Sequence, residues 1–133
     1  MSTEQNKAVV RRFIEEILTN QNAALVDELL APDYVNHFLP GGREGFKQFP
    51  TMLRSAFPDL KFHYSVEHLI AEGDYVVVRI TYHITNAGKE ATGSDLSEYR
   101  LASGKIVEDW PPSGTAALLQ QVGVTLPSGQ GDR

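Results

Sequence analysis

Two side chains in this sequence have the chemistry to move a proton near neutral pH, Asp109 and His37. Asp109 lies in residues 106–112, IVEDWPP, between apolar neighbours and just before two prolines. A carboxyl group that is withdrawn from water has a raised pKa, which makes it a candidate general acid or base. The residue could equally be an aspartate at the end of a strand that faces water. The local sequence leaves both interpretations open.

His37 ends the stretch at residues 34–37, YVNH. An imidazole has an unperturbed pKa of about 6.5, which suits proton transfer at neutral pH. The alternative is a histidine that is hydrogen-bonded at the start of a loop, and this alternative also stays open. The neighbouring Tyr34 and Asn36 are expected to have local structural roles.

Arg79, Thr81 and His83 share the odd-numbered face of one predicted strand, because successive side chains of a strand point to opposite sides. The even-numbered face of that strand is apolar, with Val76, Val78, Ile80 and Tyr82. If the odd-numbered face lines a pocket, Arg79 can pair with Asp109 and hold it ionised. If the apolar face lines the pocket, Arg79 and His83 lie outside it or at a dimer contact.

Helical spacing of apolar residues predicts four helices: one from a capping box at Ser2 and Gln5 to Leu18, one at residues 23–30 before Pro32, one around residues 46–57 that Pro50 should strain, and one at residues 116–122 ended by Gly123. Two-residue alternation then predicts two antiparallel hairpins, at residues 60–84 and 95–110. Helices followed by antiparallel strands indicate an α+β domain in which helices cover one face of a curved sheet.

The chain has 133 residues, and we expect residues 1–126 to form a single domain and residues 127–133 to be a flexible tail. A net charge of -5 with scattered basic residues argues against nucleic acid or an anionic membrane as a partner. The absence of cysteines, of a signal-like segment and of a membrane-length apolar run indicates a soluble, cytoplasmic protein. No metal-type histidine pairing or phosphate loop appears, so any chemistry is expected to use side chains alone, without a metal or cofactor.

Four segments in order resemble the SnoaL-like polyketide cyclase family of the nuclear transport factor 2-like superfamily: GREGFKQFPTMLRSAFPDLKF, LIAEGDYVVVRIT, YRLASGKIVEDW and LLQQVGV. Together they cover nearly the whole chain. The resemblance implies a cone-shaped α+β barrel, with a curved, mostly antiparallel sheet wrapped around N-terminal helices and a deep apolar pocket. It also implies a homodimer through the outer face of the sheet, and no cofactor.

Relatives in this superfamily close polyketide rings by aldol condensation, isomerise ketosteroids, dehydrate scytalone or hydrate limonene epoxide, and others have no established activity. The acid/base aspartate of the cyclases usually stands at the position that Pro111 occupies here. Asp109 lies two residues earlier, and a shift of two residues keeps the same face of a strand. Asp109 is therefore expected to point into the cone, about 6 to 7 Å deeper than the family's carboxylate.

The resemblance also bears on the other candidates. His37 stands where ketosteroid isomerases carry their general base, and Ser97 where they carry a proton-donating aspartate, for which serine is a weaker substitute. Arg79 and Thr81 match an arginine and an aspartate of limonene-epoxide hydrolases, and this match favours the odd-numbered face as the pocket lining. Threonine cannot replace that aspartate as a base, which disfavours the hydrolase mechanism.

The resulting hypothesis is a protein that binds a small, largely apolar organic molecule and acts on it as a cofactor-free cyclase, isomerase or dehydratase. Asp109 or His37 would transfer the proton by general acid-base catalysis. The residues expected to contact the substrate are Arg79, Thr81, His83, Ser97, Tyr99 and Trp110. The alternative is a non-catalytic ligand-binding or dimeric interaction module, and the sequence leaves open whether the protein is an enzyme.

Overall fold

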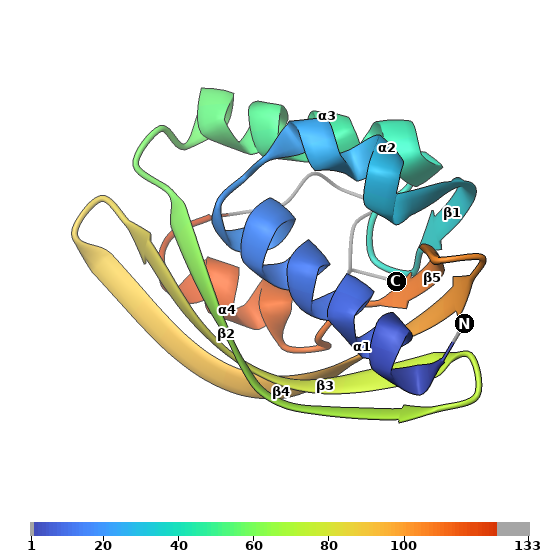
Figure 1. Ribbon diagram of the computed structural model, residues 1–133. Coiled ribbons are helices and arrows are strands. Elements are labelled where there is room, and N and C mark those ends of the chain that lie inside the picture. The colour runs from blue at the N-terminus through green and yellow to red at the C-terminus, as the bar shows by residue number, and fades with distance from the viewer. Residues whose placement is uncertain (1, 125–133) are drawn as a thin grey trace.

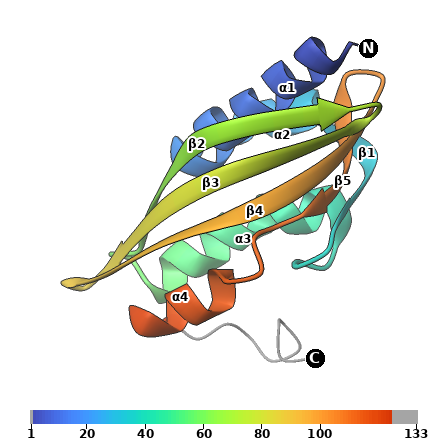
Figure 2. The ribbon, with the colours of Figure 1, turned by 90° about the horizontal axis from the view of Figure 1, so that it is seen from below.

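The computed structural model describes residues 2–124, so the predicted tail at residues 127–133 and the predicted domain end at residue 126 lie outside the described residues. Helices occupy the hollow of one curved sheet (Figures 1 and 2), which confirms the predicted α+β cone. In chain order the elements are α1 (Thr3–Arg12), the π-helix η1 (Phe13–Thr19), the 3₁₀ turn η2 (Ala23–Leu25), α2 (Val26–Leu29), β1 (Leu30–Asn36), α3 (Gly42–Ala56), β2 (Lys61–Glu72), β3 (Tyr75–Asn86), β4 (Lys89–Ala102), β5 (Lys105–Trp110) and α4 (Thr115–Gln121).

The strands form one mixed sheet in the order β1-β5-β4-β3-β2. The pairs β2–β3, β3–β4 and β4–β5 are antiparallel, which confirms the two predicted hairpins, whereas β1 is parallel to β5. The parallel pair places Asn36 of β1 directly beside Asp109 of β5. Two segments far apart in the sequence therefore meet at this edge of the sheet.

The apolar, even-numbered side of β3 faces the helices. Its residues Val76, Val78, Ile80, Tyr82 and Ile84 are at most 1% exposed. Each such burial stabilises the fold by about 1.5 to 3 kcal/mol, whereas burying an unpaired guanidinium would cost free energy. The expectation that the odd-numbered side lines the pocket is therefore wrong: Arg79 and His83 are exposed and Thr81 is half-buried on the opposite side.

The helices follow the predicted pattern except at the second one. The capping box of α1 is confirmed, because Ser2 Oγ accepts from the Gln5 N–H and Gln5 Oε1 accepts from the Ser2 N–H. The helix predicted at residues 23–30 is only a 3₁₀ turn and one α-turn, since Leu30 already pairs with β5 as the first residue of β1. Pro32 lies inside β1, an edge strand, where a missing N–H is tolerated.

No helix within residues 2–124 combines the length and apolar composition needed to cross a membrane.

Gly45, in the first turns of α3, fixes how closely the loop after β1 approaches this helix. A Cβ added at Gly45 would lie 2.1 Å from the carbonyl oxygen of Pro40. Such a distance is far shorter than van der Waals contact, so only glycine fits here. The same loop carries Phe38 and Leu39 into the cavity described below, and the close approach therefore helps to shape that cavity.

We expect Gly45→Ala to lower the free energy of unfolding by about 1 to 3 kcal/mol, the usual cost of overpacking. This loss would occur although alanine is the better helix former by about 1 kcal/mol. Urea unfolding monitored by circular dichroism measures it. The control is Gln48→Ala at an exposed position of the same helix, expected within about 0.5 kcal/mol of the wild type. A Gly45→Ala protein of wild-type stability would contradict the assigned contact.

Candidate active site

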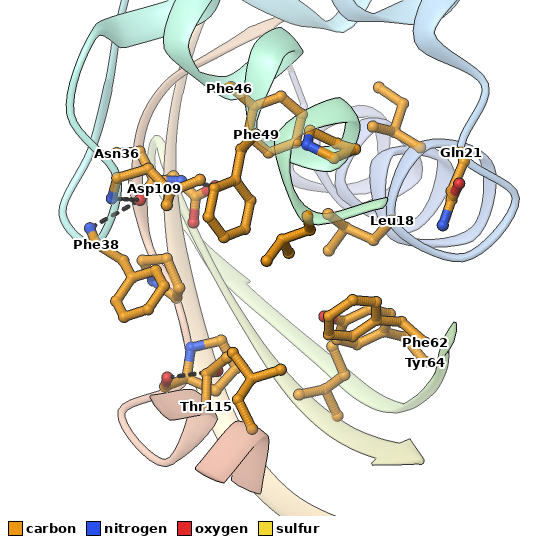
Figure 3. A pocket seen from close by; sticks show the side chains of 18 of the residues that line it. Leu18, Gln21, Asn36, Phe38, Phe46, Phe49, Phe62, Tyr64, Asp109 and Thr115 are labelled. Carbon is orange, nitrogen blue, oxygen red and sulfur yellow. Dashed lines mark hydrogen bonds between the residues drawn. The ribbon is translucent and has the colours of Figure 1, made fainter. Parts of the chain in front are cut away.

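A cavity of about 140 Å³ lies between η1, α3 and the concave face of the sheet (Figure 3). Most of its lining is apolar, with phenylalanine, leucine, isoleucine and proline side chains. Clefts of this kind, mainly apolar with a few placed polar groups, are typical binding sites for small organic molecules. The polar residues that line it are Gln21, Asn36, Arg54, Tyr64, Tyr99, Asp109 and Thr115.

Asp109 is the buried acid of this cavity, at 3% exposure. Its Oδ2 accepts hydrogen bonds from the Tyr34 hydroxyl at 2.7 Å and from Asn36 Nδ2 at 3.5 Å. Its Oδ1 is buried and has no hydrogen-bond partner among the residues that the structure describes. Burial raises the pKa of Asp109 from 3.8 to about 7, although the hydrogen bond from Tyr34 opposes this shift. The expected inward facing of Asp109 agrees with this geometry.

Tyr34 and Asn36 hold the Asp109 carboxyl group in place. The Asn36 side chain accepts from the backbone N–H groups of Phe38 and Leu39 at 2.7 and 2.8 Å, which turns its Nδ2 toward the Tyr34 hydroxyl, 2.9 Å away. Sequence reasoning assigned both residues only local roles. The signal that would have found them is the parallel pairing of β1 with β5, which no local pattern reveals.

Tyr64 and Tyr99 present two neutral phenols to the cavity. Burial raises the pKa of each above its ordinary value, and the charge of Asp109 contributes in the same direction. Tyr99 lies beside Asp109 on the adjacent strand, and its hydroxyl accepts from Ser97 Oγ at 3.3 Å. Tyr99 lines the cavity as expected, whereas Ser97 does not line it and contacts Tyr99 instead. Tyr64 was not singled out from the sequence.

His37 does not line the cavity, although its backbone N–H donates to the Asp109 carbonyl oxygen at 2.9 Å. The exposed imidazole stacks on Trp110 with ring centres 4.9 Å apart, and its Nε2 lies 2.7 Å from Glu108 Oε2. The hydrogen bond with His37, and a second one from Arg100, lower the pKa of Glu108. His37 and Trp110 therefore form a surface group, separate from the side chain of Asp109.

The odd-numbered residues of β3 are likewise remote from the cavity. Arg79 does not reach Asp109, and the expected ion pair between them is absent from residues 2–124. His83 Nε2 lies 3.2 Å from Glu90 Oε2 on the outer surface. Within the same range, no three histidine, aspartate or glutamate side chains gather in a group that could hold a metal ion.

The loop after β5 closes one side of the cavity with Pro111 and Pro112. The carboxylate of Asp95 on β4 anchors this loop, because its Oδ2 accepts from the Gly114 N–H at 3.1 Å and from Ser113 Oγ at 3.4 Å. Pro111, the position to which the resemblance assigns the cyclases' aspartate, is therefore an apolar part of the wall.

The curved sheet around helices, with one buried acid in an apolar cavity, defines an α+β cone of the nuclear transport factor 2-like kind. Residues 8–122 match the family of SnoaL-like polyketide cyclases. The protein therefore belongs to the SnoaL-like polyketide cyclase family. No curated protein sequence matches the chain.

Solved structures share the fold. Wild-type IdmH from Streptomyces antibioticus, a proposed polyketide cyclase, is 25% identical, with a TM-score of 0.73 over 90% of this chain and 99% of that one. A proposed polyketide cyclase from Bacillus cereus is 24% identical, with a TM-score of 0.76 over 95% and 87% of the two chains. A protein of unknown function from Burkholderia pseudomallei, described as NTF2-like, is 21% identical, with a TM-score of 0.75 over 93% and 100%.

We expect the raised pKa of Asp109 to make stability fall as the pH rises. The folded state holds the proton more tightly than the unfolded state, so this contribution is full below about pH 4 and is lost as the pH rises through about 7. Asp109→Asn, which cannot ionise, lacks this dependence. Urea unfolding of both proteins from pH 4 to pH 8 should show wild-type stability falling relative to the variant by on the order of 4 kcal/mol.

Glu108→Gln on the neighbouring residue is the matched control. Because the pKa of Glu108 is lowered, its contribution is present at neutral pH and is lost as the pH falls, the opposite sign. Equal pH profiles for the wild type and Asp109→Asn would contradict a buried Asp109 carboxyl group with a raised pKa.

Proposed function

We propose that this protein binds a small, largely apolar organic molecule in the cavity and that Asp109 transfers a proton to or from it without a cofactor. The reaction would be an isomerisation, a dehydration or an aldol cyclisation. One observation carries the proposal: the Asp109 carboxyl group, which lines an apolar cavity, has a pKa of about 7, and its buried Oδ1 has no hydrogen-bond partner among residues 2–124. Near neutral pH both forms of such a group are populated, so it can accept a proton and return it.

The neighbouring side chains support the same chemistry. The Tyr34 hydroxyl donates a hydrogen bond to Oδ2 of Asp109, so Oδ1 is the reacting atom in this proposal. If Oδ1 removes a proton from the carbon beside a carbonyl group, the electron pair moves to the carbonyl oxygen. The neutral phenols of Tyr64 and Tyr99 are placed at the cavity wall to donate hydrogen bonds to that oxygen. The proton then returns from Asp109 to another atom of the substrate.

The alternative is a binding module that carries out no chemistry. At three positions where relatives have catalytic carboxylates, this chain has Pro111, Thr81 and Ser97. The loss of these carboxylates favours the binding module. Among the described residues that line the cavity, Asp109 is the one carboxylic acid. Both functions use the same cavity, so the two are separated by turnover and not by binding.

We also propose that two copies associate through the outer face of the sheet. This face exposes large apolar side chains: Ile70 at 67%, Leu96 at 49% and Tyr75 at 45%. Leu96 pairs in register with Arg79, and Ile70 with Val77, so they lie on the side away from the helices. In Figure 2 no helix of the described residues crosses β2, β3 or β4 on this side.

Proton transfer can be tested with 2-indanone, a compact apolar ketone, in D₂O. We expect the wild type to accelerate deuterium incorporation beside the carbonyl group, with a rate that rises through about pH 7. Asp109→Asn should lower this rate on the order of a hundredfold with little change in ketone affinity. Mass spectrometry measures exchange, and thermal shift measures binding.

His37→Gln tests the other candidate base, and it should leave the exchange rate within about twofold because the imidazole lies outside the cavity. Loss of exchange in His37→Gln but not in Asp109→Asn would overturn the assignment. Wild-type protein that binds the ketone and leaves it unexchanged would favour the binding module.

Sedimentation tests the proposed dimer, which should have about twice the chain mass of 14.7 kDa. Leu96→Glu, which introduces a charge on the outer face, should convert it to a monomer without changing the circular dichroism spectrum. A wild-type monomer at micromolar concentration would count against an interface through the sheet.

A further inference from the structure

Arg54 and Gln21 meet at the mouth of the cavity. Both residues line it and both are exposed, in contrast to Asp109 at its buried end. Arg54 Nη1 donates to Gln21 Oε1 at 2.6 Å. Arg54 belongs to α3 and Gln21 follows η1, so this hydrogen bond joins two walls. Figure 3 shows Gln21 on the side of the cavity opposite Asp109 and Asn36.

Gln21 occupies a position at which glycine would be more stable. It follows the C-terminus of η1 with a φ of 56°, in the left-handed region. The backbone N–H groups of Gln21 and Asn22 donate to the carbonyl oxygens of Ile17 and Glu16 at 3.0 and 2.9 Å, an arrangement in which helices usually have glycine. The strained backbone places a side-chain amide at the mouth.

The charged side chains lie at opposite ends of the cavity, with a cation at its mouth and an acid at its buried end. Among the described residues that line it, Arg54 is the one cation, and within residues 2–124 it makes no ion pair. A guanidinium has five N–H donors in a planar fork that matches a carboxylate. At the other end, the ionised form of Asp109 would repel an anion, and the walls between the two are mainly apolar.

We propose that the ligand of this cavity is an apolar molecule that ends in a carboxylate, held at the mouth by Arg54 with the amide of Gln21. The neutral end of the molecule then lies against Asp109, where the proton is transferred. This inference rests on the proposed function and adds to it the chemical class and the orientation of the substrate. Arg54 and Gln21 are specificity residues in this assignment and take no part in the proton transfer.

The test uses 4-phenylbutanoate and its neutral counterpart 4-phenylbutanamide as probes, titrated at pH 6 by NMR of the ¹⁵N-labelled protein. Wild-type protein should bind the carboxylate about tenfold more tightly than the amide, with the largest shifts at residues lining the cavity. Arg54→Gln should abolish this preference, because it should weaken the binding of 4-phenylbutanoate and leave the binding of 4-phenylbutanamide unchanged. The matched control is Arg11→Gln, which removes the same charge from an exposed position on α1 and should keep the preference.

Gln21→Gly provides a second variant that is expected to fold well. It should raise the melting temperature, because glycine suits the left-handed backbone. It should also weaken the binding of 4-phenylbutanoate about threefold and leave the binding of 4-phenylbutanamide unchanged. Equal affinity of the wild type for the two probes, or equal weakening of both by Arg54→Gln, would overturn the carboxylate assignment and leave the proposed function standing. If neither probe shifts the cavity resonances at millimolar concentration while 2-indanone is still exchanged, the carboxylate assignment alone is overturned. If 2-indanone is not exchanged either, both proposals fail.

Discussion

The hydrogen bond from the Tyr34 hydroxyl to Asp109 Oδ2 is the interaction on which the site depends. A buried carboxyl group without a cationic partner costs stability when it ionises, and an apolar residue of similar size would cost none. The fold tolerates the group because one oxygen is held by Tyr34 and Asn36. The other oxygen remains without a partner among the described residues, inside an apolar cavity. The fold thus keeps a group that costs stability once the pH rises past about 7.

The opposite behaviour of Glu108 and Asp109 shows how strand geometry controls their acidity. The two acids are adjacent on β5, so their side chains point to opposite faces of the sheet. Glu108 meets His37 and Arg100 at the surface, which lowers its pKa, whereas Asp109 enters the helix-covered side, where burial raises its pKa. A difference in environment, and not in residue type, makes one of them a surface ion-pair partner and the other a candidate acid or base.

Local patterns were sufficient for much of the fold. The capping box at Ser2 and the two hairpins follow from spacing along a single segment. The inward facing of Asp109 did not, because it was expected only from the family resemblance at Pro111. The errors arose where distant segments meet. The pairing of Leu30 with β5 shortened a predicted helix, and the helices packed against the apolar face of β3 rather than the face of Arg79. Spacing defines two faces of a strand but does not say which one the rest of the chain will cover.

Because β1 pairs with β5, the contact between Tyr34 and Asp109 can form only after most of the chain has been synthesised. Tyr34 and Asp109 are 75 residues apart, and α3 and three strands lie between them. Closing so long a loop costs entropy, and contacts between distant residues form late in folding. A nascent chain exposes Tyr34 long before the ribosome has added β5. Until that strand joins the edge of the sheet, Asp109 is an ordinary acid in water, so its altered acidity belongs only to the completed sheet.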